Sequence, residues 1–222
     1  FPNALIIGEE AVAENPAILD GIPDAELSFT IDPVDGTWNY AHGLSIFGVI
    51  ISATRFGVPF FGLLYDPLMD DFIVGQDGEG AEMIMPRRAP RRLSVSKGGN
   101  IEDLQGYIPL YNLPEDKREQ VAVAMPKFER ANSLRCTAHE FRMVAQGHAD
   151  FILAGKLTPW DHAAGALICK CAGGHVAMLD GSEYRAQNRT GQLLCASDAA
   201  TWGRIRDTLD FLIDTPDTPK SA

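Results

Sequence analysis

The stretch Asp32-Pro33-Val34-Asp35-Gly36-Thr37 directly follows Leu27 to Ile31, where apolar and polar residues alternate. The alternation predicts a β-strand, and we expect it to end at Asp32-Pro33 because proline cannot donate to a strand ladder. The turn that follows combines two carboxylates, three residues apart, with a glycine that lets the chain pass close to a ligand. A strand leading into an acidic turn is therefore the local structure around which the fold is organised.

This acidic turn has the composition of a metal and phosphate site. Hard cations such as Mg²⁺ prefer oxygen ligands, and the carboxylates of Asp32 and Asp35 and the carbonyl of Val34 supply them. If a short helix starts after the turn, the N–H groups of Gly36 and Thr37 face outward and can receive a phosphate. The alternative is an ordinary turn capped by an aspartate. The complete stretch favours the metal site, because each residue then has a separate role.

Two other acidic positions extend this set. Glu9 and Glu10 follow a short apolar strand over residues 4–7, and Asp161 follows Trp160 at the start of an expected helix. An aspartate at a helix start is also a favourable N-cap. Both roles are compatible, because a carboxylate there can bind a metal while the helix dipole favours an approaching anion.

The first half of the chain is rich in strand signals. An irregular stretch with two prolines separates the strand over residues 4–7 from the one before Asp32. Further strands are expected over 47–53, 60–65 and 72–74, separated by glycine and proline turns. Short connections between strands indicate antiparallel pairing.

The second half mixes helices with strands. Apolar periodicity predicts helices over 115–124, 138–146, 161–172 and about 199–213, and strands over 176–179 and 193–196. The helix over 161–172 is expected to bury one face, and the last helix to bury Trp202, Ile205, Leu209 and Leu212. The buried face of the helix over 161–172 consists of Ala164, Leu167, Ile168 and Cys171.

This order of elements predicts an α+β protein with mixed and antiparallel sheets that fold as one compact unit. We expect residues 1–100 to form a metal- and phosphate-binding half with an antiparallel sheet. Residues 101–213 are expected to form an α/β half that closes the substrate site. Residues 214–222, rich in proline and threonine, are expected to form a flexible tail.

Composition excludes several classes of function. The 222 residues carry a formal net charge of −11, which disfavours nucleic-acid and membrane-surface partners. Hydrophobic residues make up 45%, as in a globular protein, and no apolar run approaches the roughly 20 residues that span a bilayer. The four cysteines form no CxxC pair, which indicates reduced thiols in a cytoplasmic protein, and the five histidines show no zinc spacing. The arginine-rich segment 87–92 allows an anion-binding interpretation, but a solvated loop is favoured.

Three motifs in order carry a family resemblance: Gly8-Glu9-Glu10, Asp32 to Thr37, and Trp160-Asp161-His162-Ala163-Ala164-Gly165. Together they resemble the signatures of the inositol monophosphatase family of Mg²⁺-dependent, lithium-sensitive phosphatases, and the match runs from residue 4 to about 213. The resemblance implies a layered α/β/α/β sandwich of the sugar-phosphatase type, two or three Mg²⁺ ions and a homodimer. It also implies hydrolysis of a small polyol or sugar-type phosphate, such as inositol monophosphate, by metal-activated water.

The resemblance also implies roles for individual residues. Glu9, Asp32 and Thr37 would be catalytic, with Glu9 binding metal and Thr37 orienting the attacking water. The metal ligands would be Glu9, Asp32, Val34, Asp35 and Asp161. The substrate would contact Asp35, Gly36, Thr37, Cys136, Thr137, Ala138 and Asp161.

The sequence departs from the family pattern at two places. Family members have a helical segment before Gly8-Glu9-Glu10, which carries an acidic partner for the threonine matching Thr37. This sequence does not contain it, and we expect the segment to be truncated or disordered. Inositol-cleaving members place a glutamate where this chain has Ala154. Myo-inositol phosphate is therefore not assured as the substrate, and Lys156 allows a more anionic one, although a surface lysine is the more favoured interpretation.

Two alternatives to the inositol substrate remain open. The same chemistry could act on histidinol phosphate, a 3′-phosphoadenosine nucleotide or fructose 1,6-bisphosphate. A catalytically silent regulatory homologue is less favoured, because such a protein has no need to keep mutually repelling carboxylates. The expected partner is a small phosphorylated metabolite, with no nucleic acid and no membrane.

Overall fold

The computed structural model describes residues 1–213, which build two β-sheets separated by helices. The first sheet has strand order β1-β2-β3-β4-β5-β6-β7, and β1 pairs with β2 in parallel while the other neighbours are antiparallel. The antiparallel pairing expected from the short connections is confirmed. The strands are β1 (Leu5–Gly8), β2 (Ser28–Asp35), β3 (Gly48–Arg55), β4 (Val58–Asp66), β5 (Asp71–Gln76), β6 (Gly80–Ile84) and β7 (Arg91–Arg92).

The expected end of β2 at Asp32-Pro33 is wrong, because the strand continues to Asp35. Its pairing with β3 shifts register between Asp32 and Asp35, and the side chain of Pro33 is exposed there. At such an irregularity the proline needs no ladder partner, so the strand tolerates it. Because of this bulge, Asp32 and Asp35 both lie at the end of β2.

The segment between β1 and β2 is also not irregular. It forms helix α1 (Glu9–Glu14) and a 3₁₀ helix, η1 (Pro16–Asp24), which buries Leu19 and Ile22. Asn15 caps η1, since its side chain accepts a hydrogen bond from the N–H of Ala17 at 3.3 Å. Glu9 is thus the first residue of a helix that starts directly at the end of β1.

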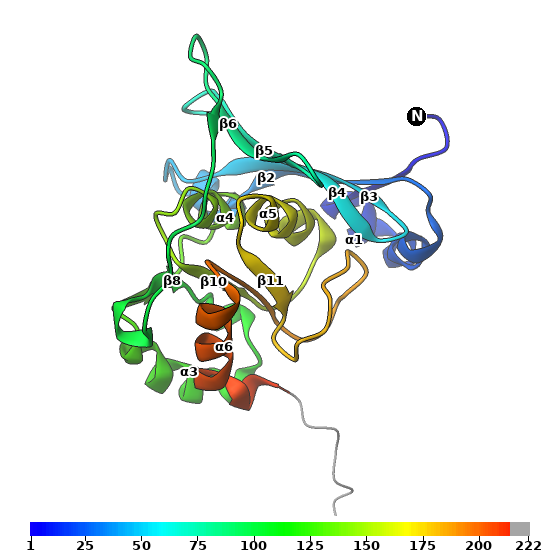
Figure 1. Cartoon of the computed structure of the whole chain (residues 1–222). Coiled ribbons are helices and arrows are strands. Elements are labelled where there is room, and N and C mark those ends of the chain that lie inside the picture. The colour runs from blue at the N-terminus through cyan, green and yellow to red at the C-terminus, as the bar shows by residue number, and fades with distance from the viewer. Residues whose placement is uncertain (214–222) are drawn as a thin grey trace, which may run out of the picture.

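The second sheet has strand order β11-β12-β10-β8-β9 and mixes parallel with antiparallel pairs. Figure 1 shows α4 and α5 between the two sheets, and α3 and α6 on the far side of the second sheet. The order of layers is therefore sheet, helices, sheet, helices, as expected for an α/β/α/β sandwich. The elements are β8 (Gln105–Tyr107), α3 (Arg118–Ala124), β9 (Arg130–Asn132), α4 (Thr137–Ala145), β10 (Phe151–Ala154), α5 (Pro159–Cys171), β11 (His175–Met178), β12 (Leu193–Ala196) and α6 (Ala199–Thr208).

Helix α5 lies at the centre of the molecule, and the expectation of one buried face was wrong. Every residue from Pro159 to Cys169 except Asp161 is buried, because sheets cover the helix on both sides. The first sheet approaches α5 closely at Gly62, where an added Cβ would lie 2.8 Å from the carbonyl oxygen of Ala164. Asp161 is therefore held by the most enclosed helix of the fold.

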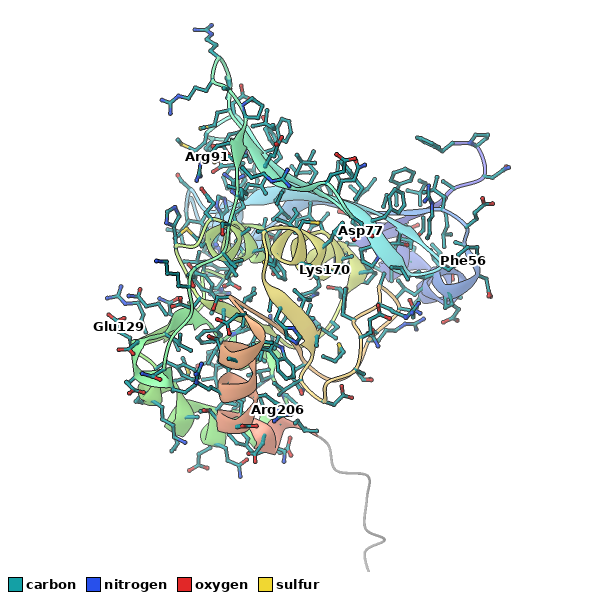
Figure 2. All side chains as sticks on the ribbon, in the orientation of Figure 1. Phe56, Asp77, Arg91, Glu129, Lys170 and Arg206 are labelled. Atoms are coloured by element: carbon teal, nitrogen blue, oxygen red, sulfur yellow. The ribbon has the colours of Figure 1, made fainter. Side chains whose placement is uncertain are left out.

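The other helices and strands expected from the sequence are present, with adjusted ends. Residues 115–117 form a 3₁₀ turn before α3, and 210–212 form another after α6. Trp202, Ile205, Leu209 and Leu212 are buried as expected. All four cysteines are free thiols, and no helix within residues 1–213 is long and apolar enough to cross a membrane. Arg91 of β7, labelled in Figure 2, donates to the side chain of Gln146, the residue after α4, at 2.9 Å. The tail expected over 214–222 lies outside the described residues.

Candidate metal and phosphate site

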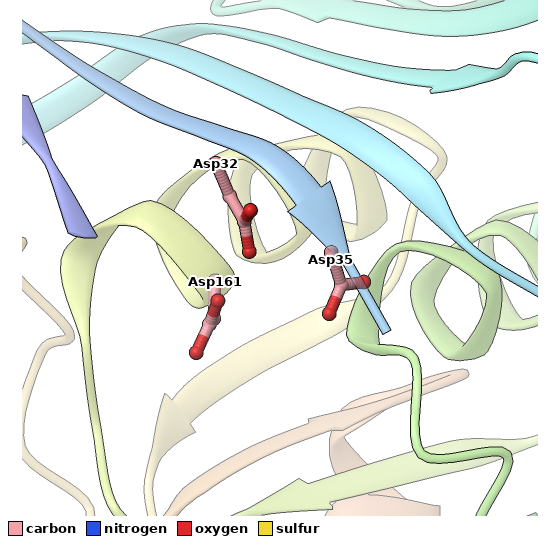
Figure 3. Close-up of side chains that lie close together, drawn as sticks. All are labelled: Asp32, Asp35 and Asp161. Atoms are coloured by element: carbon pink, nitrogen blue, oxygen red, sulfur yellow. The ribbon is translucent and has the colours of Figure 1, made fainter. Parts of the chain in front are cut away.

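Three aspartates meet where β2 ends beside the start of α5. Asp32 and Asp35 come from β2 and Asp161 from the first turn of α5, and Figure 3 shows their carboxylates facing a common space. One carboxylate oxygen of each lies within 4.8 Å of the others. Residues more than a hundred positions apart in the sequence thus form one acidic cluster.

Short hydrogen bonds fix two of these carboxylates. Asp32 Oδ1 accepts the N–H of Val34 at 2.9 Å, and this bond is closed by the bulge in β2. Asp161 Oδ2 accepts the hydroxyl of Thr158, the residue before α5, at 2.6 Å. The carboxylates of Asp32 and Asp161 therefore each have a second oxygen that takes no part in these bonds. A short local turn fixes the orientation of each carboxylate.

Asp35 is held by the start of α4. Its Oδ2 accepts the backbone N–H of Ala138 at 2.6 Å and the thiol of Cys136 at 3.2 Å. Burial and the charge of Asp35 raise the pKa of the Cys136 thiol well above its usual range, so the thiol stays protonated and donates. Cys136 and Ala138, expected to contact substrate, thus hold the Asp35 carboxylate of the acidic cluster.

The cluster is electrostatically strained without a cation. Burial first, and then the charges of Asp161 and Glu9, raise the pKa of Asp32 to about 7. Burial likewise raises the pKa of Asp161 to about 6, and the pKa of Asp35 also lies above its usual value. A divalent cation would relieve this repulsion, because nearby positive charge favours ionised carboxylates. The donor set therefore fits a hard metal ion.

Glu9 stands apart from the three aspartates. Its side chain is exposed at the start of α1 and is not part of the 4.8 Å cluster. Its charge nevertheless contributes to the raised pKa of Asp32 and of Asp161. Glu9 therefore lies near the cluster, at its solvent side.

The turn after β2 adopts a conformation suited to glycine. Gly36 has φ +84°, and helix α2 (Thr37–Ala41) begins immediately after it. The hydroxyl of Thr37 donates to the carbonyl of Val34 at 2.9 Å. Because a carbonyl oxygen has two lone pairs, Val34 can still offer one to a metal.

A cavity of about 800 Å³ opens beside the cluster and is lined by Asp35 and Asp161. Cys136 and Thr137 also line it, whereas Ala138 is fully buried and does not. Ala154 lines the wall where inositol-cleaving members were expected to place a glutamate. Lys156 is exposed and is not among the lining residues.

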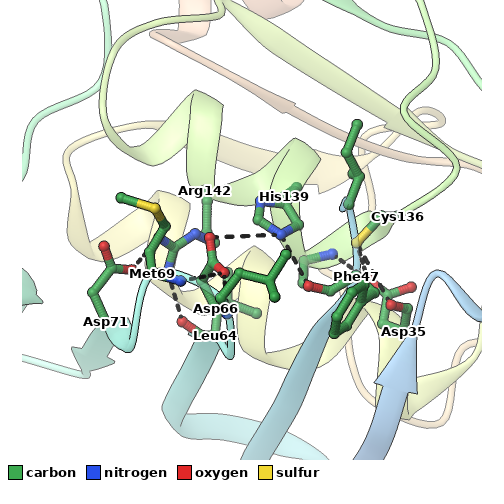
Figure 4. Close-up of polar contacts among 12 residues, drawn as sticks. Asp35, Phe47, Leu64, Asp66, Met69, Asp71, Cys136, His139 and Arg142 are labelled. Atoms are coloured by element: carbon green, nitrogen blue, oxygen red, sulfur yellow. Dashed lines mark hydrogen bonds and ion pairs between the residues drawn. The ribbon is translucent and has the colours of Figure 1, made fainter. Parts of the chain in front are cut away.

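Helix α4 is anchored to the first sheet by a buried polar network, drawn in Figure 4. The Arg142 guanidinium pairs with Asp71 and donates to the carbonyl of Leu64 at 3.0 Å. His139 Nε2 lies 3.1 Å from the carbonyl oxygen of Phe47 and 3.9 Å from Asp66. His139 therefore faces the sheet and not the cavity, which agrees with a structural role.

Sequence reasoning missed many of the residues that line the cavity, and two of them, Arg135 and Glu140, are charged. Arg135 lines the cavity, and no motif had singled it out. Glu140 also lines it and accepts hydrogen bonds from Ser133 and Leu134. Burial raises the pKa of Glu140 to about 7. The only signal in the sequence was the proximity of both residues to Cys136-Thr137.

Comparison with known proteins agrees with this geometry. The family model described as "Inositol monophosphatase family" matches residues 1–210. The chain belongs to the inositol monophosphatase family. It is 30% identical over 187 residues to an inositol-1-monophosphatase of Bacillus subtilis, covering 83% of this chain and 67% of that protein.

Two further relatives of this inositol monophosphatase family member broaden the comparison. A fructose-1,6-bisphosphatase/inositol-1-monophosphatase of Thermotoga maritima is 29% identical, over 84% of this chain and 66% of that protein. The solved inositol monophosphatase of Anabaena is 27% identical with a TM-score of 0.75, covering 96% of this chain and 79% of that one. The chain thus spans about two thirds of the length of the curated relatives it matches.

Proposed function

We propose that this chain is a Mg²⁺-dependent phosphomonoesterase that hydrolyses a small polyol or sugar-type phosphate. The observation that carries the proposal is the cluster of three carboxylates with raised pKa values at the wall of an 800 Å³ cavity. Family membership supports it, because the named relatives include inositol-1-monophosphatases and a fructose-1,6-bisphosphatase.

Asp32, Asp35, Asp161, Glu9 and the carbonyl of Val34 would hold two or three Mg²⁺ ions. Bound Mg²⁺ supplies Lewis acidity that activates water and neutralises charge on a phosphate. The carboxylates themselves would set the positions of the ions. The carboxylates of Asp32 and Asp161 are fixed by hydrogen bonds from the N–H of Val34 and the hydroxyl of Thr158. Cys136 and the N–H of Ala138 do the same for Asp35.

The other chain groups would bind and orient the reactants. The N–H groups of Gly36 and Thr37 would receive phosphate oxygens, and the Thr37 hydroxyl and Glu9 would orient the attacking water. Thr37 already donates to Val34, so its hydroxyl oxygen remains free to accept a hydrogen bond from water. Thr137, which lines the cavity, would contact the substrate.

We also infer how the chain is organised around this site. Residues 1–100 would supply most metal and phosphate ligands, and residues 101–213 would supply Asp161 and the wall that closes the cavity. The remaining expectations, a cytoplasmic homodimer that acts on a small metabolite and binds no nucleic acid, are kept as proposals.

The test is release of inorganic phosphate from a panel of small phosphates, measured with Mg²⁺ and with a chelator. Inositol monophosphate, histidinol phosphate, a 3′-phosphoadenosine nucleotide and fructose 1,6-bisphosphate are the panel. We expect Mg²⁺-dependent release that Asp161→Asn abolishes. Asp116→Asn makes the same charge change at an exposed residue before α3 and should leave release intact. Equal release by both variants would contradict the assignment.

A further inference from the structure

Arg135 has an unfavourable backbone conformation at the cavity wall. Its φ is +56°, in the left-handed region that glycine occupies readily and that side chains bearing Cβ rarely adopt. It precedes Cys136, which supports Asp35 through its thiol. Strain of this kind persists only where the surrounding structure enforces it, and it concentrates at functional sites.

The buried side chain of Asn39 enforces this conformation from one side. Asn39 is 1% exposed, and its Nδ2 donates to the carbonyl of Leu134 at 2.8 Å and to that of Arg135 at 3.4 Å. It also donates to the carbonyl of Ile46 at 2.9 Å. Because Asn39 belongs to α2, the helix that follows Gly36, it ties the Arg135 turn to the expected phosphate turn.

Glu140 fixes the same turn from the other side. It is 3% exposed and its Oε1 accepts the N–H of Leu134 at 2.7 Å and the hydroxyl of Ser133 at 2.9 Å. The Ser133 hydroxyl in turn accepts the N–H of Arg135 at 3.0 Å. The buried side chains of Asn39 and Glu140 thus fix the backbone conformation at Arg135, and with it the direction of the Arg135 side chain.

The Arg135 guanidinium lies over the indole of Trp38, with its central carbon 3.7 Å from the ring centroid. Trp38 is 44% exposed and stacks on His42 at 4.1 Å. Within residues 1–213, no hydrogen-bond acceptor or ion-pair partner of the guanidinium is found. Its N–H donors are therefore free to bind a ligand, while the ring restricts the side chain.

Arg135 is the only Lys or Arg among the described residues that line the cavity. It lies beside the expected phosphate turn, because a Cβ added at Gly36 would come within 3.1 Å of the Cβ of Cys136. The guanidinium of Arg135 thus lies at a cavity whose other charged lining residues are the carboxylates of Asp35, Glu140 and Asp161. This arrangement matches anion recognition, since guanidinium binds phosphate and carboxylate through paired donors.

We propose that Arg135, stacked on Trp38, binds a second anionic group of the substrate. The preferred substrates of this chain then carry a phosphate or a carboxylate in addition to the phosphate that is hydrolysed. This inference rests on the proposed function and deepens it. It also replaces the less favoured interpretation of Lys156 as the residue that recognises a more anionic substrate, because Lys156 does not line the cavity.

The test measures binding, so that it does not depend on turnover. Alkane phosphonates with a single anionic end are compared calorimetrically, at low salt with Mg²⁺, with bisphosphonates and phosphonocarboxylates of the same chain length. We expect the wild-type chain to bind a two-anion ligand about tenfold more tightly than its matched single-anion ligand, which is the scale of about 1.4 kcal/mol. The carboxylate and phosphonate ends show which anion is preferred.

Arg135→Gln should abolish this tenfold preference and leave binding of the single-anion ligands unchanged. Arg135→Gly removes the charge while accepting the left-handed backbone, so it controls for misfolding. Arg88→Gln makes the same charge change on the exposed loop before β7 and should keep the preference. Equal loss for all ligands would show that Arg135 acts on the common phosphonate, and no loss for any would show that it only stacks on Trp38. Either result overturns the inference.

The two proposals can fail separately. If wild-type chain releases no phosphate from any substrate but still prefers two-anion ligands in an Arg135-dependent way, the proposed function fails and the binding role of Arg135 stands. If it releases phosphate but Arg135→Gln changes no preference, the proposed function stands and this inference fails.

Discussion

Replacing Asp32 by asparagine should make the metal-free protein more stable while removing its response to Mg²⁺. Asp32 is 3% exposed and shares its space with the charges of Asp161 and Glu9. Asparagine keeps the oxygen that accepts the N–H of Val34 and removes the buried charge. The substitution therefore separates the electrostatic strain of the site from its geometry.

The magnitude follows from the pKa of Asp32, which rises from 3.8 to about 7 in the folded protein. Between those values the folded state binds more protons than the unfolded state, so stability falls as pH rises through this window. At roughly 1.4 kcal/mol per pKa unit, the ionised carboxylate destabilises the metal-free fold by at most about 4 kcal/mol at pH 8. At pH 5 most of the folded protein carries a protonated Asp32, and the effect falls below about 2 kcal/mol.

The assay is urea unfolding of both proteins at pH 5 and pH 8, with chelator and with excess Mg²⁺. Comparing the two proteins isolates Asp32 from other groups, such as the buried His162, whose lowered pKa acts in the opposite direction. We expect Asp32→Asn to have a higher free energy of unfolding than the wild type at pH 8 without metal. Mg²⁺ at a hundred times its Kd should stabilise only the wild type, by about 2.7 kcal/mol. A variant that is less stable at pH 8, or that gains as much from Mg²⁺, would refute this reasoning.

Two further predictions concern the supports of the site. Gly36→Ala should destabilise the fold by more than the roughly 1–2 kcal/mol of left-handed strain, because its Cβ would lie 2.9 Å from a backbone oxygen. Gly43→Ala, with φ +76° and no atom within 4 Å of the added Cβ, should show the strain alone. Equal losses of stability in thermal unfolding would contradict the close packing at Gly36. Arg142→Met leaves the buried Asp71 unpaired and should cost about 3–5 kcal/mol. Adding Asp71→Leu should restore most of that loss in urea unfolding, and an additive loss would contradict a paired role.

The pairing of Asp32 with Asp35 could be predicted because its signal in the sequence is local. Asp32 and Asp35 are three residues apart at the end of a strand, and no long-range information is needed to place them together. Asp161 was joined to them by the family resemblance, since spacing alone does not show that α5 starts beside β2. Pro33 led to a wrong strand end, because a bulge was needed to accommodate it and bulges depend on the partner strand.

The presence of Arg135 at the cavity wall could not be predicted from the sequence. Arg135 is notable only for its left-handed φ, which is imposed by Asn39 and Glu140 through the folded structure. The all-round burial of α5 was missed for a related reason. A helix between two sheets has no face exposed to solvent. Interpreting apolar periodicity as one buried face therefore could not predict that α5 is buried on all sides.

The most direct test of the central claim is phosphate release from the small-phosphate panel, measured for wild-type chain with Mg²⁺ and with chelator. The carboxylate cluster predicts release that requires Mg²⁺, stops with chelator and returns when Mg²⁺ is restored. Release that continues undiminished in chelator would contradict the account. So would the absence of release from every substrate by folded chain that is saturated with Mg²⁺.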